Sequence, residues 1–277
     1  MQKPTELITS RQNSLVSLTV SLSDRRHRQR EGLFRFDGKK LFLEALDAAL
    51  PLVAVLLRAA SADALLSLCG ERELPSGCRA VLLSDSLFDR ISEEKSPEGV
   101  ICVCAVLTAL HQTLGEGEAL PPSLLASKRV LLLESVRDPG NLGTVLRAAR
   151  AFGTDAVVLS ADCADIYHAR TVRGAMGTLF SQPIYTVPVM ADAVRALAKT
   201  RRVFAATLDA RAARLGSFPV REGDVVLVGN EGHGLSAAAI AAATDSVFIP
   251  MEAGVESLNA GVAASVLMWE IFGVGKQ

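Results

Sequence analysis

The stretch VLLLESVRDPGNLGTVLRAARAFG, residues 130–153, decides the fold class of this chain. Its four apolar residues Val130–Leu133 suit a strand that is buried on both faces. The Asp-Pro-Gly sequence at 138–140 predicts a turn, Asn141 stands where a helix N-cap belongs, and Gly153 ends a helix over Leu142–Phe152. A buried strand that leads through a polar loop into a helix is the repeating unit of parallel α/β sheets.

The same alternation continues to the C-terminus. Short apolar runs predict strands at Val130–Leu133, Ala156–Leu159, Ile184–Val187, Val203–Thr207, Val225–Val228 and Val247–Ile249. Helices are expected at Leu142–Phe152, Ala169–Thr178, Ala191–Thr200, Ala237–Ala243 and about Asn259–Phe272. The sequence therefore predicts a parallel sheet covered by helices on both faces.

The N-terminal part has a different texture, with mixed helix and strand signals. Helices are predicted at Leu41–Leu50, Ser61–Leu68 and Ser86–Ile91, the last with Ser84 as N-cap, and strands at Ala80–Leu83 and Val100–Val106. The stretch GEGEALPPS, Gly115–Ser123, breaks the pattern. We expect a smaller α/β domain over residues 1–114, a linker over 115–127 and a larger α/β domain over 128–277.

Charge is unevenly distributed along the chain. The 277 residues are 49% hydrophobic and 21% charged, which excludes a disordered chain, and the net charge of −1 speaks against a polybasic nucleic-acid binder. The first 40 residues nevertheless hold nine basic and four acidic side chains, a balance of +5 that leaves −6 for the rest. The two ends therefore have different expected partners.

Other features point to a cytoplasmic protein. The N-terminus lacks the apolar core of a signal peptide, and Leu41–Ala60 contains Glu44, Asp47 and Arg58, too polar for a membrane span. The five cysteines form no C-x-x-C pair, so we expect small buried residues, a reducing compartment and no metal site.

Two further glycine-rich or polar loops follow predicted strands. In VGNEGHGLS, Val228–Ser236, three glycines let the backbone approach a ligand, but their order is neither a dinucleotide fingerprint nor a P-loop. In IPMEAGVESLNAGVAASVLMWEI, Ile249–Ile271, Ser257 suits an N-cap of an apolar helix that is core or interface. Taken singly, each loop is equally consistent with an ordinary turn, a helix cap or a surface acid.

Together, in this order, the loops resemble one family. The patterns N-x-G-x-x-x-R (Asn141 to Arg147), G-N-E-G-x-G-L (Gly229 to Leu235) and I-P-M…V-E-S-L-N (Ile249 to Asn259) look like the signature motifs of SpoU/TrmH RNA ribose methyltransferases of the SPOUT superfamily. The resemblance implies a parallel-sheet domain with a C-terminal trefoil knot, a homodimer, and methyl transfer from S-adenosylmethionine to a ribose 2′-hydroxyl.

The resemblance also assigns residues. It implies cofactor contacts at Leu208, Gly229, Ile249, Met251 and Leu258, and catalytic roles for Arg147, Asn141, Glu231, Ser257 and Asn259. The family arginine is proposed to assist removal of the 2′-proton. Because a guanidinium stays protonated in proteins, a phosphate-orienting or alkoxide-stabilising role for Arg147 stands beside that of base. No role is assigned to His111 or His233.

RNA contacts are expected from clustered cations. The run Arg25, Arg26, Arg28 and Arg30 lies in a region similar to the family's substrate-binding domain, as do Thr9-Ser10, Asn13 and GLFRFDG, residues 32–38. Arg170 and Arg173 lie in a segment where the family often has Ser/Asn-Pro-Lys and this chain has His168-Ala169-Arg170.

The expected substrate is large-subunit (23S) rRNA. The alternatives are tRNA, an antibiotic-resistance rRNA methyltransferase, a non-catalytic RNA-binding protein with the knotted fold, or a general nucleotide-binding α/β enzyme.

Overall fold

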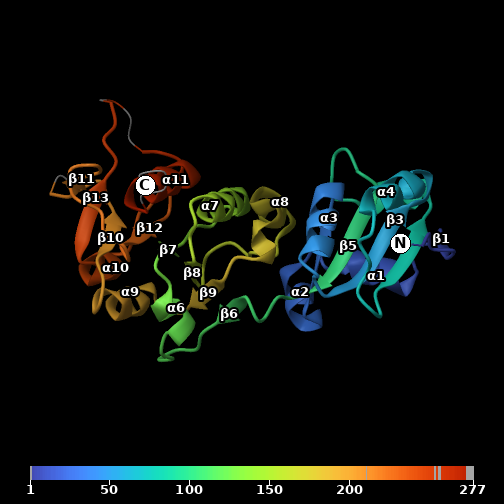
Figure 1. The fold of residues 1–277 in the computed structure, drawn as a ribbon, viewed down its shortest axis with the longest axis horizontal. Coiled ribbons are helices and arrows are strands. Elements are labelled where there is room, and N and C mark those ends of the chain that lie inside the picture. The colour runs from blue at the N-terminus through green and yellow to red at the C-terminus, as the bar shows by residue number, and fades with distance from the viewer. Residues whose placement is uncertain (1, 210, 253, 255–256, 273–277) are drawn as a thin grey trace. The chain divides into compact units, whose positions relative to one another are not determined.

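The computed structural model describes residues 2–209, 211–252, 254 and 257–272 (Figure 1). The chain divides into two compact units. Unit 1 comprises Met1–Leu107 and Tyr167–Phe180, and unit 2 comprises Thr108–Ile166 and Ser181–Gln277. The chain therefore passes between the units three times.

Unit 1 is built on a five-stranded mixed sheet. Its strands are β1 (Leu7–Ile8), β2 (Leu33–Asp37), β3 (Leu52–Arg58), β4 (Arg79–Leu83) and β5 (Val100–Ala105), in the order β1-β4-β3-β5-β2. Strands β1, β4 and β3 are parallel, and β5 is antiparallel to both β3 and β2. The helices are α1 (Ser14–Ser21), α2 (Arg25–Glu31), α3 (Lys39–Asp47), α4 (Ala62–Cys69), α5 (Asp85–Ile91) and α8 (Ala169–Ala175), with 3₁₀ turns η1 (Ala59–Ser61) and η2 (Met176–Phe180).

Strand β3 is not among the strands predicted from sequence, where this apolar stretch is considered only as a membrane span. Its sequence LVAVLLR buries residues 54–57 almost completely in the middle of the sheet. Because both faces are covered, the run is continuously apolar and carries no alternation. Among the described residues, no helix is both long enough and apolar enough to cross a bilayer.

The segment Tyr167–Phe180 is contributed to unit 1 from the middle of the sequence of unit 2. The Tyr167 ring lies 4.5 Å from that of Phe34, and the Phe180 ring lies 5.3 Å from that of Phe36. The Tyr167 hydroxyl accepts a hydrogen bond from the Leu107 backbone NH at 2.8 Å. These aromatic contacts explain why a segment that the sequence assigns to the larger domain clusters with the N-terminal one.

Unit 2 contains an eight-stranded sheet in which every pairing is parallel. Its order is β11-β13-β10-β12-β7-β8-β9-β6, with β6 (His111–Thr113), β7 (Val130–Leu133), β8 (Ala156–Ser160), β9 (Ile184–Val187), β10 (Val203–Ala206), β11 (Ala213–Arg214), β12 (Val225–Val228) and β13 (Asp245–Phe248). The predicted parallel sheet is confirmed, and each of its six predicted strands is present within a residue or two.

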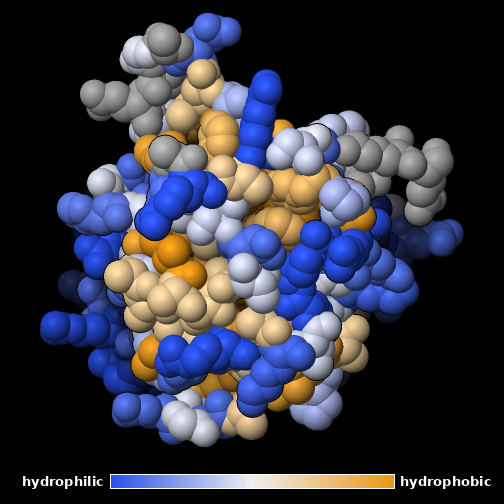
Figure 2. All heavy atoms as spheres, turned by 90° about the vertical axis from the view of Figure 1, so that its left-hand side faces the viewer, coloured by the Kyte–Doolittle hydropathy of each residue, from blue (hydrophilic) through white to orange (hydrophobic). Residues whose placement is uncertain are grey.

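Helices cover both faces of this sheet (Figure 1). One face carries α7 (Pro139–Ala151) and α11 (Ala260–Ile271), which pack on each other, and the other carries α6 (Pro122–Ala126), α9 (Met190–Ala198) and α10 (Ala237–Ala242). Strand β6, which lies within the expected N-terminal domain (1–114), pairs with β9 of this unit, and Leu124 of α6, within the expected linker (115–127), is fully buried. Both residues of the two-residue edge strand β11 are exposed. On this end of the unit, hydrophilic side chains lie beside apolar surface (Figure 2).

Two predicted helix caps are wrong by two or three residues. The N-cap of α7 is Asp138, whose side chain accepts from the Asn141 backbone NH, so Asn141 lies in the first turn. The N-cap of α11 is Asn259, which accepts from the backbone NH groups of Gly261 and Val262, and Ser257 precedes it. In both cases a competing cap residue stands nearby, and only the backbone path decides which is used.

Candidate active site

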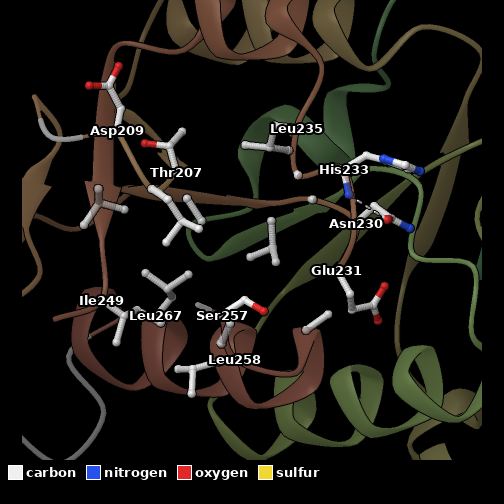
Figure 3. Close-up of a pocket in the computed structure, with 18 of the residues that line it drawn as sticks. Thr207, Asp209, Asn230, Glu231, His233, Leu235, Ile249, Ser257, Leu258 and Leu267 are labelled. Atoms are coloured by element: carbon white, nitrogen blue, oxygen red, sulfur yellow. Dashed lines mark hydrogen bonds between the residues drawn. The ribbon is translucent and has the colours of Figure 1, made fainter. Parts of the chain in front are cut away.

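A cavity of about 520 Å³ opens at the carboxyl ends of strands β10, β12 and β13 (Figure 3). This is where an open parallel sheet places its ligand sites, and the volume suits a small organic molecule. Its walls come from three segments: the end of β10 with residues 207–209, the glycine loop Gly229–Leu235 after β12, and, after β13, Ile249, Met251, Ser257 and Leu258 with the start of α11. Val255 and Glu256 of the third sequence motif lie outside the described residues.

The structure brings all five expected cofactor residues to this cavity: Leu208, Gly229, Ile249, Met251 and Leu258. Leu208 lies at the rim, where its side chain is 69% exposed. The lining is otherwise mostly apolar side chains and glycine backbone. Such a surface suits an organic ligand with apolar parts that is held partly by backbone groups.

The glycine loop is a tight hairpin. The backbone groups of Asn230 and Gly234 exchange two hydrogen bonds of 3.1 and 2.9 Å, and the Asn230 Oδ1 atom accepts from the NH groups of Gly232 and His233 at 2.8 and 3.1 Å. A Cβ atom on Gly229 would lie 2.5 Å from the Gly234 carbonyl, so the close approach requires glycine there.

Three of the expected catalytic side chains form one chain of hydrogen bonds. The Asn259 Nδ2 atom donates to Asn141 Oδ1 at 2.9 Å, and Asn141 Nδ2 donates to the Glu231 carboxylate. Glu231 points from the glycine loop toward helix α7 (Figure 3). Because each amide uses both its donor and its acceptor, the orientation of the set is determined. Ser257, like Glu231, is among the residues that line the cavity.

Arg147 is not part of that chain. It lies exposed on α7 and does not line the cavity, and its side chain makes no hydrogen bond or ion pair with another described residue. Arg147 and Asn141 are six residues apart, which places them on different sides of the helix.

Negative charge borders the cavity. Asp209 and Glu231 both line it, and hydrogen bonds from the Arg211 side chain and backbone lower the pKa of Asp209. In the described part of the chain, no three His, Cys, Asp or Glu side chains are grouped as a metal site would need.

The cavity also contains residues to which the sequence assigns no role. Thr207, Asp209, Asn230, His233, Leu235 and Leu267 line the cavity. The Thr207 Oγ1 atom is buried without a hydrogen-bond partner among the described residues, so it is a candidate ligand contact. The signal that points to Thr207 and Asp209 is their place at the end of a predicted parallel strand and just after it.

The expected RNA-contacting arginines do not behave alike. Arg25 and Arg26 are exposed on α2, Arg30 is exposed but pairs with Glu31, and Arg170 and Arg173 are exposed on α8. The prediction that Arg28 belongs to an exposed RNA-contacting cluster is wrong, because its side chain is only 4% exposed. Its Nη1 atom donates to the carbonyl oxygens of Leu22 and Ser23 at 2.7 and 2.8 Å, so it caps the end of α1 instead of facing solvent.

Comparisons with known proteins agree with this arrangement. Residues 128–269 match the model of the SpoU rRNA Methylase family, and residues 13–102 match the MRM3-like substrate binding domain. The chain belongs to the SpoU rRNA methylase family. The sequence-based recognition of SpoU/TrmH-type motifs is thereby confirmed.

The relatives match over nearly the whole chain. The 23S rRNA (guanosine(2553)-2′-O)-methyltransferase RlmP of Bacillus subtilis is 30% identical over 96% of this chain and 99% of its own length. A TrmH-family structure from Porphyromonas gingivalis, 28% identical, superposes with a TM-score of 0.77 over 95% of this chain and 98% of that one. The AdoMet-bound rRNA methyltransferase of Sinorhizobium meliloti, 24% identical, shares the fold, with a TM-score of 0.77 over 96% and 97% of the two chains.

Proposed function

We propose that this chain transfers the methyl group of S-adenosylmethionine to a ribose 2′-hydroxyl of 23S rRNA. The observation that carries the proposal is the hydrogen-bonded chain Asn259–Asn141–Glu231 at the border of an apolar cavity walled by the glycine loop. The family membership and the substrate named for the Bacillus subtilis relative support the choice of RNA.

The cavity fits the methyl donor on three counts. Ile249, Met251 and Leu258 offer apolar contact, glycine backbone can approach a ligand closely, and the Glu231 carboxylate favours a cation. The donor supplies the electrophilic methyl group, so the protein has mainly to orient the two reactants. Asn141 and Glu231, joined by a hydrogen bond, hold the ribose side of the site, and Ser257 offers a hydroxyl in the wall of the same cavity.

We propose that Arg147 stabilises the developing alkoxide or orients a phosphate and does not act as the base. Because a guanidinium stays protonated at all accessible pH values, it cannot readily accept the 2′-proton. The same permanent charge is what stabilising an alkoxide or binding a phosphate requires. Its solvent-exposed position on α7 supports contact with a polyanion.

The proposed activity is tested by mapping 2′-O-methylated nucleotides in RNA from cells with and without the gene. We expect one ribose in 23S rRNA to lose its methyl group and to regain it with the wild-type gene. The Asn141→Ala variant should fail to restore it. A site that appears in tRNA instead would overturn the substrate, and an unchanged methylation map would overturn the activity.

We propose a homodimer formed through α11. Val262, Val266 and Trp269 follow each other at helical spacing and are 50%, 37% and 48% exposed, and the Trp269 ring lies edge-on 5.8 Å from Phe152. An apolar stripe of this kind suits burial against a second copy. Because Arg147 lies outside the cluster of its own protomer, the arginine acting at each site would come from the partner subunit.

Complementation tests this assembly. Mixed dimers of Asn141→Ala and Arg147→Ala chains should regain about half of the wild-type rate, because one of their two sites contains both residues. Trp269→Glu should shift the mass measured by light scattering toward one chain and abolish transfer. A fully active monomer, or the absence of complementation, would refute the shared site.

The path of the chain supports a further proposal, the trefoil knot. Strand β13 is separated from β12 by β10, yet α11, which follows β13, packs on β12 and α7. We propose that the returning segment threads an earlier loop. A crystal structure showing an unthreaded path from β12 to α11 would contradict this.

We propose RNA binding by the exposed arginines Arg25 and Arg26 of unit 1, within the matched substrate-binding domain. Alanine at both positions should weaken binding and lower the slope of log affinity against log salt by about 0.9 per lost phosphate contact. Arg195→Ala is the matched control, because that exposed arginine lies in unit 2 and pairs with Asp192. An unchanged slope in the double variant would remove these residues from the interface.

Since 23S rRNA is cytoplasmic in bacteria, we infer the same compartment for this protein, testable by fractionation.

A further inference from the structure

We infer that Ser135 and Asp162 form a brace that holds the glycine loop, through Asn230, in the conformation that binds the methyl donor. The inference rests on the proposed function of the cavity and extends it to two residues outside the cavity wall. Neither belongs to the sequence motifs assigned to catalysis or to cofactor contact.

The first observation is backbone strain at Ser135. This residue follows β7 directly and has φ +58°, in the left-handed region that side chains with a Cβ atom rarely adopt. Among the described residues of unit 2, no other residue apart from glycines has a positive φ. Such a conformation persists only where surrounding contacts enforce it.

The second observation is the set of contacts that enforce it. The Ser135 NH donates to Ser160 Oγ at 2.8 Å, and the Ser135 hydroxyl donates to Asp162 Oδ2 at 2.7 Å. The other Asp162 oxygen accepts from Ser160 Oγ at 2.6 Å, and Arg137 donates to Oδ2. Although desolvation acts in the opposite direction, these hydrogen bonds lower the pKa of Asp162 to about 2. Ser135 is therefore clamped between the ends of two adjacent strands.

The third observation links the clamp to the cavity. The Ser135 carbonyl accepts a 2.8 Å hydrogen bond from Asn230 Nδ2, and Asn230 in turn organises the turn at Gly232 and His233. The backbone conformation of Ser135 determines where that carbonyl points. Between Gly229 and Gly234 the loop has no apolar side chain to bury, so hydrogen bonds must determine its shape.

The brace is tested by measuring the dissociation constant of S-adenosylmethionine by calorimetry. Ser135→Ala removes the hydroxyl and keeps a Cβ in the strained conformation, so Kd should rise about tenfold. Ser135→Gly removes the same hydroxyl but accepts the positive φ, so the rise should be smaller, about threefold. Asp162→Asn should give an intermediate rise. The KM for the donor should increase while that for RNA stays constant.

Asp155→Asn is the matched control. Asp155 accepts from the backbone NH groups of Lys128 and Arg129 at the opposite ends of β7 and β8. This variant should lower the melting temperature without changing the donor Kd. A merely structural role for Ser135 predicts the same behaviour for Ser135→Ala, and that result would overturn the brace.

A double-mutant cycle tests the route through Asn230. Asn230→Asp removes the donor to Ser135 and keeps an oxygen acceptor for the loop, so its effect on Kd should not add to that of Ser135→Gly. Full additivity would refute the linkage. If the wild-type protein itself failed to bind the donor, the proposed function would fall, whereas wild-type binding with unaffected variants refutes the brace alone.

Discussion

The substitution Gly229→Ala tests the close packing of the glycine loop. Gly229 does not have a positive φ, so an added methyl group meets a problem of space and not of backbone conformation. The new Cβ would lie 2.5 Å from the Gly234 carbonyl carbon and oxygen and 2.6 Å from the Leu235 nitrogen. Since contacts of this kind normally need about 3.5 Å, the loop backbone must move by roughly 1 Å.

The cost follows from what that movement breaks. Overpacking typically costs about 1–3 kcal/mol, and losing one of the two backbone hydrogen bonds between Asn230 and Gly234 costs about 1 kcal/mol more. We expect a loss of roughly 2–4 kcal/mol in the free energy of unfolding. For a domain of this size that corresponds to a fall of roughly 6–12 °C in Tm.

Differential scanning calorimetry measures the fall in Tm, and titration calorimetry measures the affinity for the methyl donor. Gly232→Ala is the control for stability, because its nearest neighbour would be the Asn230 Oδ1 atom at an ordinary 3.5 Å. We expect it to change the free energy of unfolding by less than about 0.5 kcal/mol. A Gly229→Ala protein with wild-type Tm and wild-type donor affinity would refute the reasoning.

Three further predictions concern stability and reactivity. Arg28→Ala should cost unit 1 about 2–4 kcal/mol, because it leaves the Leu22 and Ser23 carbonyls without their charged donor; denaturant unfolding that matches wild type would contradict this. The pKa of Asp162 is lower in the folded protein than in the unfolded chain. The difference in the free energy of unfolding between wild type and Asp162→Asn should therefore be largest above about pH 4 and shrink as the pH falls toward 2. A difference that does not change with pH would contradict the hydrogen bonds assigned to this carboxylate. Burial raises the pKa of all five cysteine thiols, to about 11 for Cys78 and about 12 for Cys104; the others are Cys69, Cys102 and Cys163. Iodoacetamide at neutral pH should therefore label the native protein slowly and the denatured protein at five sites, as counted by mass spectrometry. Rapid labelling of the native protein would contradict this.

The large unit was readable from sequence because its central strands are apolar on both faces. Runs such as Val130–Leu133 and Val225–Val228 can bury all their side chains only inside a sheet covered by helices. The same reasoning failed for Leu52–Arg58, where a buried strand and a lipid-like helix have the same composition. Length and neighbouring strands decide between the two, and neighbours are not visible locally.

The membership of Tyr167–Phe180 in unit 1 also depended on tertiary contacts. Its helix was predicted from residues 169–178, but nothing in its sequence says that its aromatic side chains pack on Phe34 and Phe36. Arg28 shows the same limit within one helix. A run of arginines reads as an exposed face, and only the position of the preceding helix end buries one of them.

For the candidate site, sequence alone determined which residue types stand at the ends of the strands, because catalysis and close backbone approach restrict those positions to Asn, Glu, Ser and Gly. It also determined the family and hence the chemistry. Only the tertiary structure decided how these residues are connected: which amide donates to Glu231, that Arg147 stands apart from the cluster, and that Ser135 is held in a strained conformation beneath the glycine loop. The physical reason is that hydrogen bonds between segments about a hundred residues apart depend on strand order and register, which no local pattern encodes.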